Sequence, residues 1–582
     1  MRSTRARRRW LALMPLALLL AGLAPTPQKG IVGFQWGVAC GDMAADSLVL
    51  WTRADRPARL TPEVDTRPDF ATARALAPVE AGPASDLTAK SLVTGLAPGT
   101  LYYYRLRGPA AEASPSGTCH TAYAPDQAAP LTIGFTGDAD WRWKPYPLLR
   151  ALNHEPLDFF VFLGDLIYEW MDPDGNTVAE TLDEYRLRYR DNREPRWGFS
   201  DEAPLRETYG RFGHYSVFDN HELGLSLADP AAPSYNEGGA PAVEGAATLV
   251  RETPGFGARV QAYDEYQPVR RRAVQGSGDA RIDGTPGYYY VQPWGATATL
   301  IVADDRSYRA ARLASSDDPA GDSPDRTMLD RWQLNWLEQA LLDAQQRGVI
   351  WKLVVISSPI QEIGRPSEIG VELDTAKSWA GGYRYERDRL LQFIDQQGID
   401  NVVFLTTDNH YTQINNLRYH AVPGDPASPR LPARNAFEIL TGPLGASTAY
   451  PNVGAALDGL SGRAADRVEV ATLVGDAPSS RAGVHGQKAA GLDPIGLEPD
   501  FAGLVAASVL DPDGTSGTVE PAAFAAYRTF GYAVLTVDGD LLTVRVEGLP
   551  AVDYPELADP AALTRYNAEE PRTIIRFQVR AR

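Results

Sequence analysis

The stretch that decides the fold is Leu157-Asp158-Phe159-Phe160-Val161-Phe162-Leu163-Gly164-Asp165-Leu166-Ile167-Tyr168-Glu169. Its apolar run, Phe159 to Leu163, is typical of a strand buried on both faces in the middle of a layered sheet. The run stops at Gly164, which permits close backbone approach, and delivers Asp165 to the carboxyl end, where layered α/β folds place their ligands. Tyr168 follows three residues later. A carboxylate and a phenol on one tight turn predict a metal-binding edge.

Three other segments end in the same way, with Asp, Asn or His after an apolar run. They carry Asp138, Asn220 with His221, and Asp408 with His410. A single Gly-Asp is a common turn and carries little information. Four such ends in order along alternating strands and helices predict that these side chains meet at one rim of the sheets.

Strands and helices alternate along the middle of the chain. Strands are predicted over residues 131–135, 298–303, 351–357 and 401–405, helices over 146–152, 330–346 and 387–396, and a hairpin from 532–537 to 541–546. This alternation predicts a layered α/β fold.

Histidine is scarce, which limits the chemistry of the predicted site. The chain has seven histidines, and none lies between His221 and His410. A centre built mainly from Asp, Asn and Tyr oxygens favours hard cations such as ferric iron, calcium, magnesium or manganese over zinc.

The chain begins with a basic segment followed by an apolar one. Arginines at 5 and 7–9 precede an apolar run from Trp10 to Ala24, too short for a good bilayer span. Arg7-Arg8-Arg9-Trp10-Leu11 approximates a twin-arginine signal. We interpret residues 1–29 as an export signal, and expect a periplasmic or secreted protein without a stable membrane span once the signal is removed. A retained anchor helix is the alternative.

The 582 residues carry a formal net charge of −18. Nucleic acids and anionic membranes select basic surfaces, so this acidic balance argues against either as a partner. It suits a site built from carboxylates.

Short alternating strands predict an N-terminal all-β sandwich over residues 30–125. A Gly-Leu-Ala-Pro-Gly-Thr turn at 95–100 and the tyrosine-rich strand after it look like the late strands of a fibronectin-type sandwich. Both cysteines of the chain, Cys40 and Cys119, lie in this region. In an exported protein such a pair suggests a disulfide, but the sequence leaves their pairing open. A Pro/Ala-rich linker at 122–130 follows.

The order Asp, Gly-Asp-x-x-Tyr, Asn-His-Glu and Asp-x-His resembles the calcineurin-like metallophosphoesterases. More narrowly, the chain resembles the PhoD-like alkaline phosphatase and phosphodiesterase family from Phe34 to about Tyr411. The stretches that carry this resemblance are Phe34–Asp42, Leu50–Arg53, Gly164–Glu169, Phe218–Glu222, Trp336–Glu338, Trp351-Lys352, Trp379, Gly382-Tyr383 and Glu386-Arg387.

The resemblance implies a metallophosphoesterase domain over residues 131–582, behind the N-terminal fibronectin-type sandwich. Its fold would be α/β, of the α+β sandwich type, with two mixed sheets flanked by helices. Long loops rich in Gly, Ala and Pro, over residues 228–256 and after residue 423, would shape the pocket.

The resemblance also implies a binuclear centre. Asp165 would bridge two ions; Asp138, Tyr168 and His410 would complete one site, typically ferric iron, and Asn220 and Asp408 the other, typically calcium. Manganese, magnesium and zinc are alternatives. Two ions roughly 3.5–4 Å apart clamp a phosphate, neutralise its charge and lower the pKa of a bound water.

Two further residues receive roles from the resemblance. His221 would protonate the leaving alkoxide or orient the phosphoryl group. Arg306 would contact the phosphate, with a structural salt bridge as the alternative. Asp138 stands where the family usually has a cysteine. Asp140 and Asp219 are spare carboxylates that would bind metal or cap a turn.

These observations predict an exported metal-dependent phosphoesterase acting on phosphomonoesters, phosphodiesters or both. Its substrate would be a small phosphate ester or a phospholipid or teichoic-acid-like polymer. One alternative is a non-catalytic surface protein on a degenerate phosphoesterase fold. Another is a purple acid phosphatase-like enzyme, which the missing histidine between His221 and His410 disfavours. The oligomeric state is left open.

Overall fold

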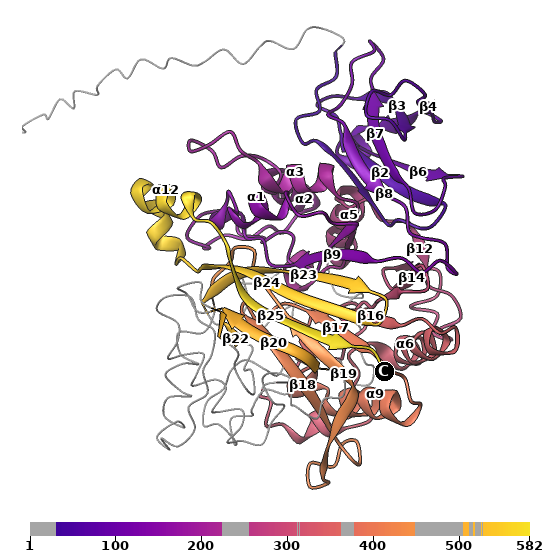
Figure 1. Cartoon of the computed structure of the whole chain (residues 1–582). Helices are drawn as coiled ribbons and strands as arrows, with labels where there is room; N and C mark the ends of the chain where they lie inside the picture. The colour runs from indigo at the N-terminus through magenta and orange to yellow at the C-terminus, as the bar shows by residue number, and fades with distance from the viewer. Residues whose placement is uncertain are drawn as a thin grey trace, which may run out of the picture.

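A computed structural model describes residues 31–223, 255–310, 312–313, 315–361, 378–448, 504–510, 516–517, 525–526 and 528–582 (Figure 1). The predicted export signal, most of the predicted loop over 228–256, and most of the loops expected after residue 423 lie outside these ranges. Within them, no helix is both long and apolar enough to cross a bilayer.

The first sheet contains the strand predicted at the start. Its order is β21-β20-β25-β24-β23-β9-β10-β11-β1-β2-β6. The buried strand β10 (Phe159–Phe162) pairs in parallel with β9 (Leu131–Thr136) on one side and β11 (His214–Ser216) on the other. An antiparallel set continues the sheet beyond β9, namely β23 (Thr529–Asp538), β24 (Leu541–Pro550), β25 (Arg572–Arg580), β20 (Leu504–Leu510) and β21 (Ser516–Gly517).

The second sheet has the order β14-β15-β16-β17-β19-β18-β22. Its strands are β14 (Tyr290–Trp294), β15 (Ala298–Val302), β16 (Trp351–Val355), β17 (Val402–Thr406), β19 (Arg430–Leu440), β18 (Thr412–His420) and β22 (Ala525–Ala526). The four from β15 to β19 in this order run parallel, and the others pair antiparallel. Both sheets are therefore mixed, as predicted.

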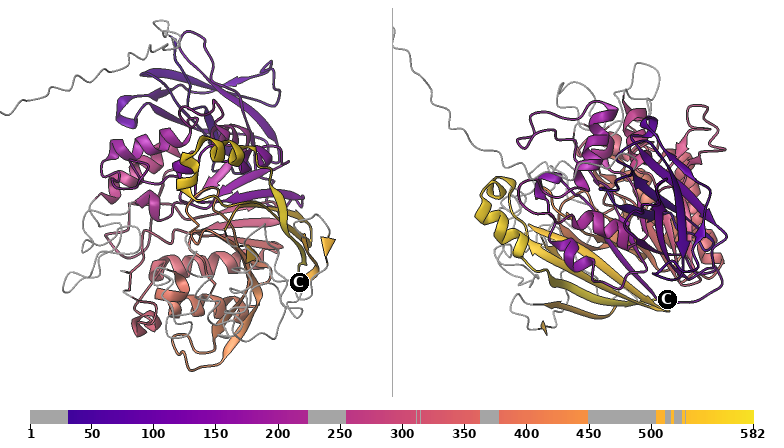
Figure 2. Two further views of the ribbon diagram at one scale, coloured as in Figure 1. Left: turned by 90° about the vertical axis from the view of Figure 1, so that its left-hand side faces the viewer. Right: turned by 90° about the horizontal axis from the view of Figure 1, so that it is seen from above.

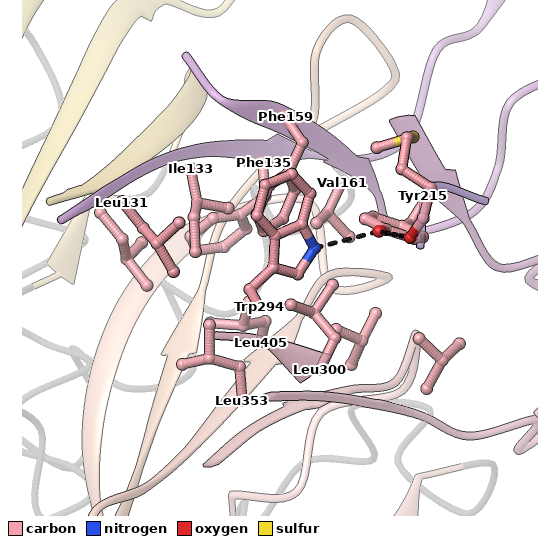
Figure 3. Packing of buried hydrophobic residues seen from close by; sticks show 14 of the residues in the cluster. Leu131, Ile133, Phe135, Phe159, Val161, Tyr215, Trp294, Leu300, Leu353 and Leu405 are labelled. Atoms are coloured by element: carbon pink, nitrogen blue, oxygen red, sulfur yellow. Dashed lines mark hydrogen bonds between the residues drawn. The ribbon is translucent and has the colours of Figure 1, made fainter. Parts of the chain in front are cut away.

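An apolar core joins the facing surfaces of the two sheets. Trp294 projects between them, and its ring stacks on Phe159 with centroids 4.3 Å apart (Figure 3). The indole N–H donates to the hydroxyl of Tyr215 over 3.0 Å. Leu300, Leu353 and Leu405 of the second sheet are fully buried in the same core. Each such side chain contributes about 1.5–3 kcal/mol on burial, so the two sheets form one rigid support.

Helices cover the outer faces of both sheets, which gives four layers (Figures 1 and 2). Over the first sheet lie α1 (Leu148–Leu152), α2 (Leu182–Asn192), α3 (Pro204–Arg211), α5 (Phe256–Tyr266) and α12 (Pro560–Ala568). Over the second lie α6 (Asp330–Gln346), α8 (Trp379–Gly382) and α9 (Arg384–Gln396). Short elements are α4 (Asn220–Leu223), β12 (Arg272–Ala273), β13 (Pro286–Gly287) and the 3-10 turns η1 (Pro83–Ser85), η2 (Trp141–Trp143), η4 (Pro319–Asp322) and η6 (Tyr554–Ala558).

Most predicted elements occur where expected. The helix predicted over 330–346 is α6, whereas the helix predicted from 387 begins at Arg384. The predicted hairpin is β23–β24, in which Asp538 pairs with Leu541 across a two-residue turn. Gly539 opens that turn with φ of +56°, which glycine adopts readily.

The N-terminal strands form two layers. One holds β1 (Val38–Gly41), β2 (Ser47–Arg53) and β6 (Thr88–Thr94); the other holds β3 (Ala58–Asp65), β4 (Arg74–Ala75), β5 (Val79–Ala81), β7 (Leu101–Arg107) and β8 (Gly117–His120). A disulfide between Cys40 and Cys119 links β1 to β8 across 79 residues. Closing a loop of that length stabilises the fold by roughly 4–5 kcal/mol in the chain-entropy account.

The N-terminal layer that holds β1, β2 and β6 continues the first sheet. The sequence did not predict this continuation. Gly41 of β1 pairs in parallel with His214 of β11. The next residue, Asp42, donates its N–H to the His214 carbonyl over 3.2 Å. The Asp42 carboxylate accepts bonds of 2.7 and 2.6 Å from the Arg272 guanidinium. Strand pairing and this ion pair together hold the sandwich against the layers below.

His214 at this junction links stability to pH. Burial, followed by the nearby charge of Arg193, lowers its pKa from 6.5 to about 3. The unfolded chain therefore binds a proton that the folded chain refuses, and stability is lost as pH falls below 6.5. Between pH 7.5 and 5.5 this linkage lowers the free energy of unfolding by about 1.4 kcal/mol.

The variant His214→Gln has no imidazole to protonate at this position. Its free energy of unfolding, measured with a denaturant, should therefore lack this loss of about 1.4 kcal/mol between pH 7.5 and 5.5. Identical pH dependence in variant and wild type would contradict the assignment.

Candidate metal centre

The predicted strand ends meet at one rim of the two sheets. Asp138 follows β9, Asp165 follows β10, and Asp408 and His410 follow β17. The first two turns are bonded directly, because Asp138 N–H donates to the Gly164 carbonyl over 3.1 Å and Ala139 N–H to the Asp165 carbonyl over 2.7 Å. Pairing of β9 with β10 thus sets the spacing of the two carboxylates.

The four residues predicted for the first ion lie together. Ligand atoms of Asp138, Asp165 and His410 all lie within 4.8 Å of one another. His410 Nε2 is 3.3 Å from Asp138 Oδ1 and 2.9 Å from the hydroxyl oxygen of Tyr168. One histidine and three oxygen-bearing side chains therefore converge here.

The residues predicted for the second ion lie beside the same aspartate. Asn220 begins α4, and the N–H of His221 donates to Asp165 Oδ1 over 2.9 Å. Asp408 is close enough for its charge to raise the pKa of Asp165. The His221 ring lies 3.8 Å from the Tyr168 ring between centroids, and its Nε2 lies 3.9 Å from Asp165 Oδ2.

The turns that carry the candidate ligands hold an unusual backbone conformation. Asp138, Asp165, Asp408 and His410 have φ of 59°, 50°, 70° and 57°. Non-glycine residues reach this left-handed region at a cost of about 1–2 kcal/mol each. Gly164 has φ of 108°, and a Cβ there would lie 2.5 Å from the Asp219 Cβ. Four strained residues at one rim are a mark of a functional site.

Glu222 braces two of these turns, a role that the sequence alone did not predict. Its buried carboxylate accepts N–H bonds from Asp165 (3.0 Å), Leu166 (2.5 Å) and Asp219 (2.7 Å). Burial raises the pKa of Glu222 to about 7, although the three N–H groups oppose the rise. The only sequence signal for this brace was the Glu that ends Asn-His-Glu.

The site has the donors that metal cations need. Asp138 Oδ1, Asp165 Oδ2, Asp219 Oδ2 and Asn220 Oδ1 are buried and accept no hydrogen bond from any residue that the structure describes. Burial, and then the charges of neighbouring carboxylates, raise the pKa of Asp165 well above its usual range. Buried acceptors of like charge are costly unless a cation neutralises them. The residues present fit metal ions held mainly by oxygen.

Arg306 forms a buried salt bridge, which is the role predicted for it as the alternative to phosphate contact. Its guanidinium, almost fully buried, pairs with Asp219 and lies 3.2 Å from Asp408 Oδ2. Burial opposes its charge, but the carboxylates prevail and raise its pKa. The other spare carboxylate, Asp140, caps η2 and binds the Arg142 guanidinium.

Replacing Arg306 tests this assignment. Arg306→Met leaves Asp219 and Asp408 buried without their cation, so the free energy of unfolding should fall by about 3–5 kcal/mol. Arg580→Met removes an ion pair with Asp540 whose side chains are half exposed, and should cost less than about 1 kcal/mol. Similar small losses in both variants, measured by chemical denaturation, would show that Arg306 does not neutralise the buried carboxylates.

Comparison with known proteins places the chain in a family. The family model for PhoD-like phosphatase matches residues 133–481, more than half of the chain, and the model for the N-terminal domain of PhoD-like phosphatase matches residues 21–123. Alkaline phosphatase D of Bacillus subtilis (strain 168) is 28% identical over 420 residues, which span 66% of this chain and 65% of that relative. The match thus covers slightly less than two thirds of the relative's length.

A solved structure shows the same fold. The chain in "Structure of PhoD" aligns with a TM-score of 0.65 at 21% identity, over 94% of this chain and 90% of that one. A purple acid phosphatase from yellow lupin (Lupinus luteus) aligns at a TM-score of 0.48 and 10% identity, over 95% of this chain and 74% of that one. On the family match over residues 133–481, this chain belongs to the PhoD-like phosphatase family.

Proposed function

We propose that this chain is an exported metal-dependent phosphoesterase that hydrolyses phosphomonoesters, phosphodiesters or both through a binuclear centre. The observation that carries the proposal is the convergence of Asp138, Asp165 and His410 within 4.8 Å at the rim of the sheets. Membership of a phosphatase family supports the same reaction.

The donor set suggests how two ions would be held. Asp138, Asp165, Tyr168 and His410 would bind one, and Asp165, Asn220 and Asp408 the other. Carboxylate, phenol and amide oxygens favour hard cations, which supports ferric iron with calcium, with manganese, magnesium or zinc as alternatives. An aspartate at 138, where relatives of this type usually carry cysteine, makes the first site richer in oxygen.

The bound ions would neutralise charge on the phosphoryl group and lower the pKa of a water. His221 would serve the leaving group, because its Nε2 lies at the centre, 3.9 Å from Asp165 Oδ2. Proton donation to a leaving alkoxide is worth about 10²–10⁴ in rate. Arg306 would act indirectly, by holding Asp408 in place through the contact at 3.2 Å.

Charge and redox state bear on substrate and location. A net charge of −18 disfavours nucleic acids as partners. The substrates that the family resemblance suggests are small phosphate esters or a phospholipid or teichoic-acid-like polymer. The disulfide between Cys40 and Cys119 supports an oxidising compartment, in keeping with a periplasmic or secreted protein.

Asp165→Asn tests the proposal, since Asp165 would bridge both ions. The variant keeps the side-chain shape but loses the negative charge, so metal content and hydrolysis of an aryl phosphate ester should disappear together. Asp388→Asn is the control, because Asp388 is buried in α9 against His420. Elemental analysis and a release assay provide the measurement. Full turnover by Asp165→Asn would refute the proposed function.

A further inference from the structure

An arginine is buried where the N-terminal sandwich meets the helices over the first sheet (Figure 1). Arg193 follows α2, and its guanidinium carbon lies 4.2 Å from the ring centroid of Trp51 in β2 and 4.1 Å from that of Tyr209 in α3. Its Nη2 donates over 2.8 Å to the carbonyl of Tyr266, the last residue of α5. Groups from the sandwich and from the helices therefore enclose this cation.

The contacts of Arg193 do not balance its charge. Aromatic rings and a carbonyl at a helix end offer only partial negative charge. Among the residues that the structure describes, no carboxylate forms an ion pair with Arg193, and its Nη1 has no hydrogen-bond partner. Burial lowers its pKa, and neighbouring tyrosines, Tyr209 first, oppose the fall only in part. An unpaired charge is costly in the interior, so a negative charge beside Nη1 would stabilise the folded chain.

Two tyrosine hydroxyls near Arg193 are also buried and without a partner in the described part of the chain. Tyr189 lies four residues earlier in α2, on the same face of the helix, and its ring stacks on that of Tyr266 at 5.3 Å between centroids. Tyr104 comes from β7 of the sandwich. Burial raises the pKa of the Tyr104 hydroxyl, and Arg193 is close enough for its charge to oppose the rise. N–H and O–H donors from α2 and β7 therefore lie around one buried cation.

We propose that Arg193, together with the hydroxyls of Tyr104 and Tyr189, binds a chloride ion or another halide of similar size. One negative charge cancels the one unpaired positive charge, whereas a phosphate or sulfate dianion would leave an excess of negative charge in the interior. Charge-assisted hydrogen bonds from the guanidinium would hold the ion. It would link α2 to β7, and thereby stabilise the junction between the sandwich and the helices. None of the three residues is a candidate metal ligand, so the inference does not depend on the proposed function.

Urea denaturation of the full chain, purified without chelator, in sodium chloride and in sodium gluconate tests the proposal. Gluconate is too large for a site enclosed by buried side chains, and equal salt concentrations keep the screening of surface charges the same. For a dissociation constant of about 50 mM, raising chloride from about 5 to 500 mM should increase the ratio of folded to unfolded chain about 10-fold more than gluconate does. Bromide should act as chloride does, and a crystal grown in bromide should show anomalous scattering beside Arg193 Nη1.

Three variants assign the effect to these donors. Arg193→Met should abolish the difference between chloride and gluconate. Tyr104→Phe and Tyr189→Phe each remove only a hydroxyl, so they should fold, and weaker binding of the ion should reduce the difference to about 2-fold. Tyr419→Phe is the control, because Tyr419 lies on β18 of the second sheet and its hydroxyl lies 3.1 Å from Asp395 Oδ2. This control should keep the full difference.

Equal stability in chloride and gluconate would overturn the inference, and would show that water satisfies the buried donors. A difference that persists in Arg193→Met, or that stays complete in both hydroxyl variants, would overturn it as well, because the ion would then bind elsewhere. If Arg193→Met does not fold, the two hydroxyl variants and the position of bromide in the crystal decide.

Discussion

The mutual repulsion of buried carboxylates is the constraint on which this structure depends. Asp138, Asp165, Asp219 and Asp408 crowd one rim, and their charges are among those that raise the pKa of Asp165 or Asp219. Arg306 offsets part of that charge through Asp219 and Asp408. Within the described ranges, several carboxylate oxygens still accept no hydrogen bond. Such an arrangement costs free energy in the absence of cations, which makes it a candidate site for metal ions.

The layered core holds these carboxylates close together despite their mutual repulsion. The four candidate ligand residues with positive φ follow buried strands that are paired on both sides. The packing of these strands therefore offsets the free-energy cost of the strained turns. Glu222 adds a local brace, because one carboxylate accepts the N–H groups of both Asp165 and Asp219. Strain, burial and charge are thus concentrated in the same few turns.

Local patterns predicted the strands and their ends, but not what joins them. The apolar run at Phe159 marked β10, and Asp or His after such runs marked the site. The ion pairs of Arg306, and the hydrogen bonds of Glu222 to the turn at Asp165, join residues that are far apart in the sequence. Such contacts produce no periodic pattern in the sequence. The pairing of Gly41 with His214 joins residues more than 170 positions apart, so no local sequence pattern such as a hairpin turn predicts it.

Elemental analysis of the wild-type chain, purified without chelator, shows whether the rim of the two sheets binds two metal ions. If the rim is organised to neutralise buried carboxylates, each chain should retain two metal ions through gel filtration, and their removal should lower the midpoint of denaturation. Bound cations stabilise the folded state because the unfolded chain lacks the site. A folded chain that carries no stoichiometric metal, and hydrolyses phosphate esters at full rate without it, would contradict the account.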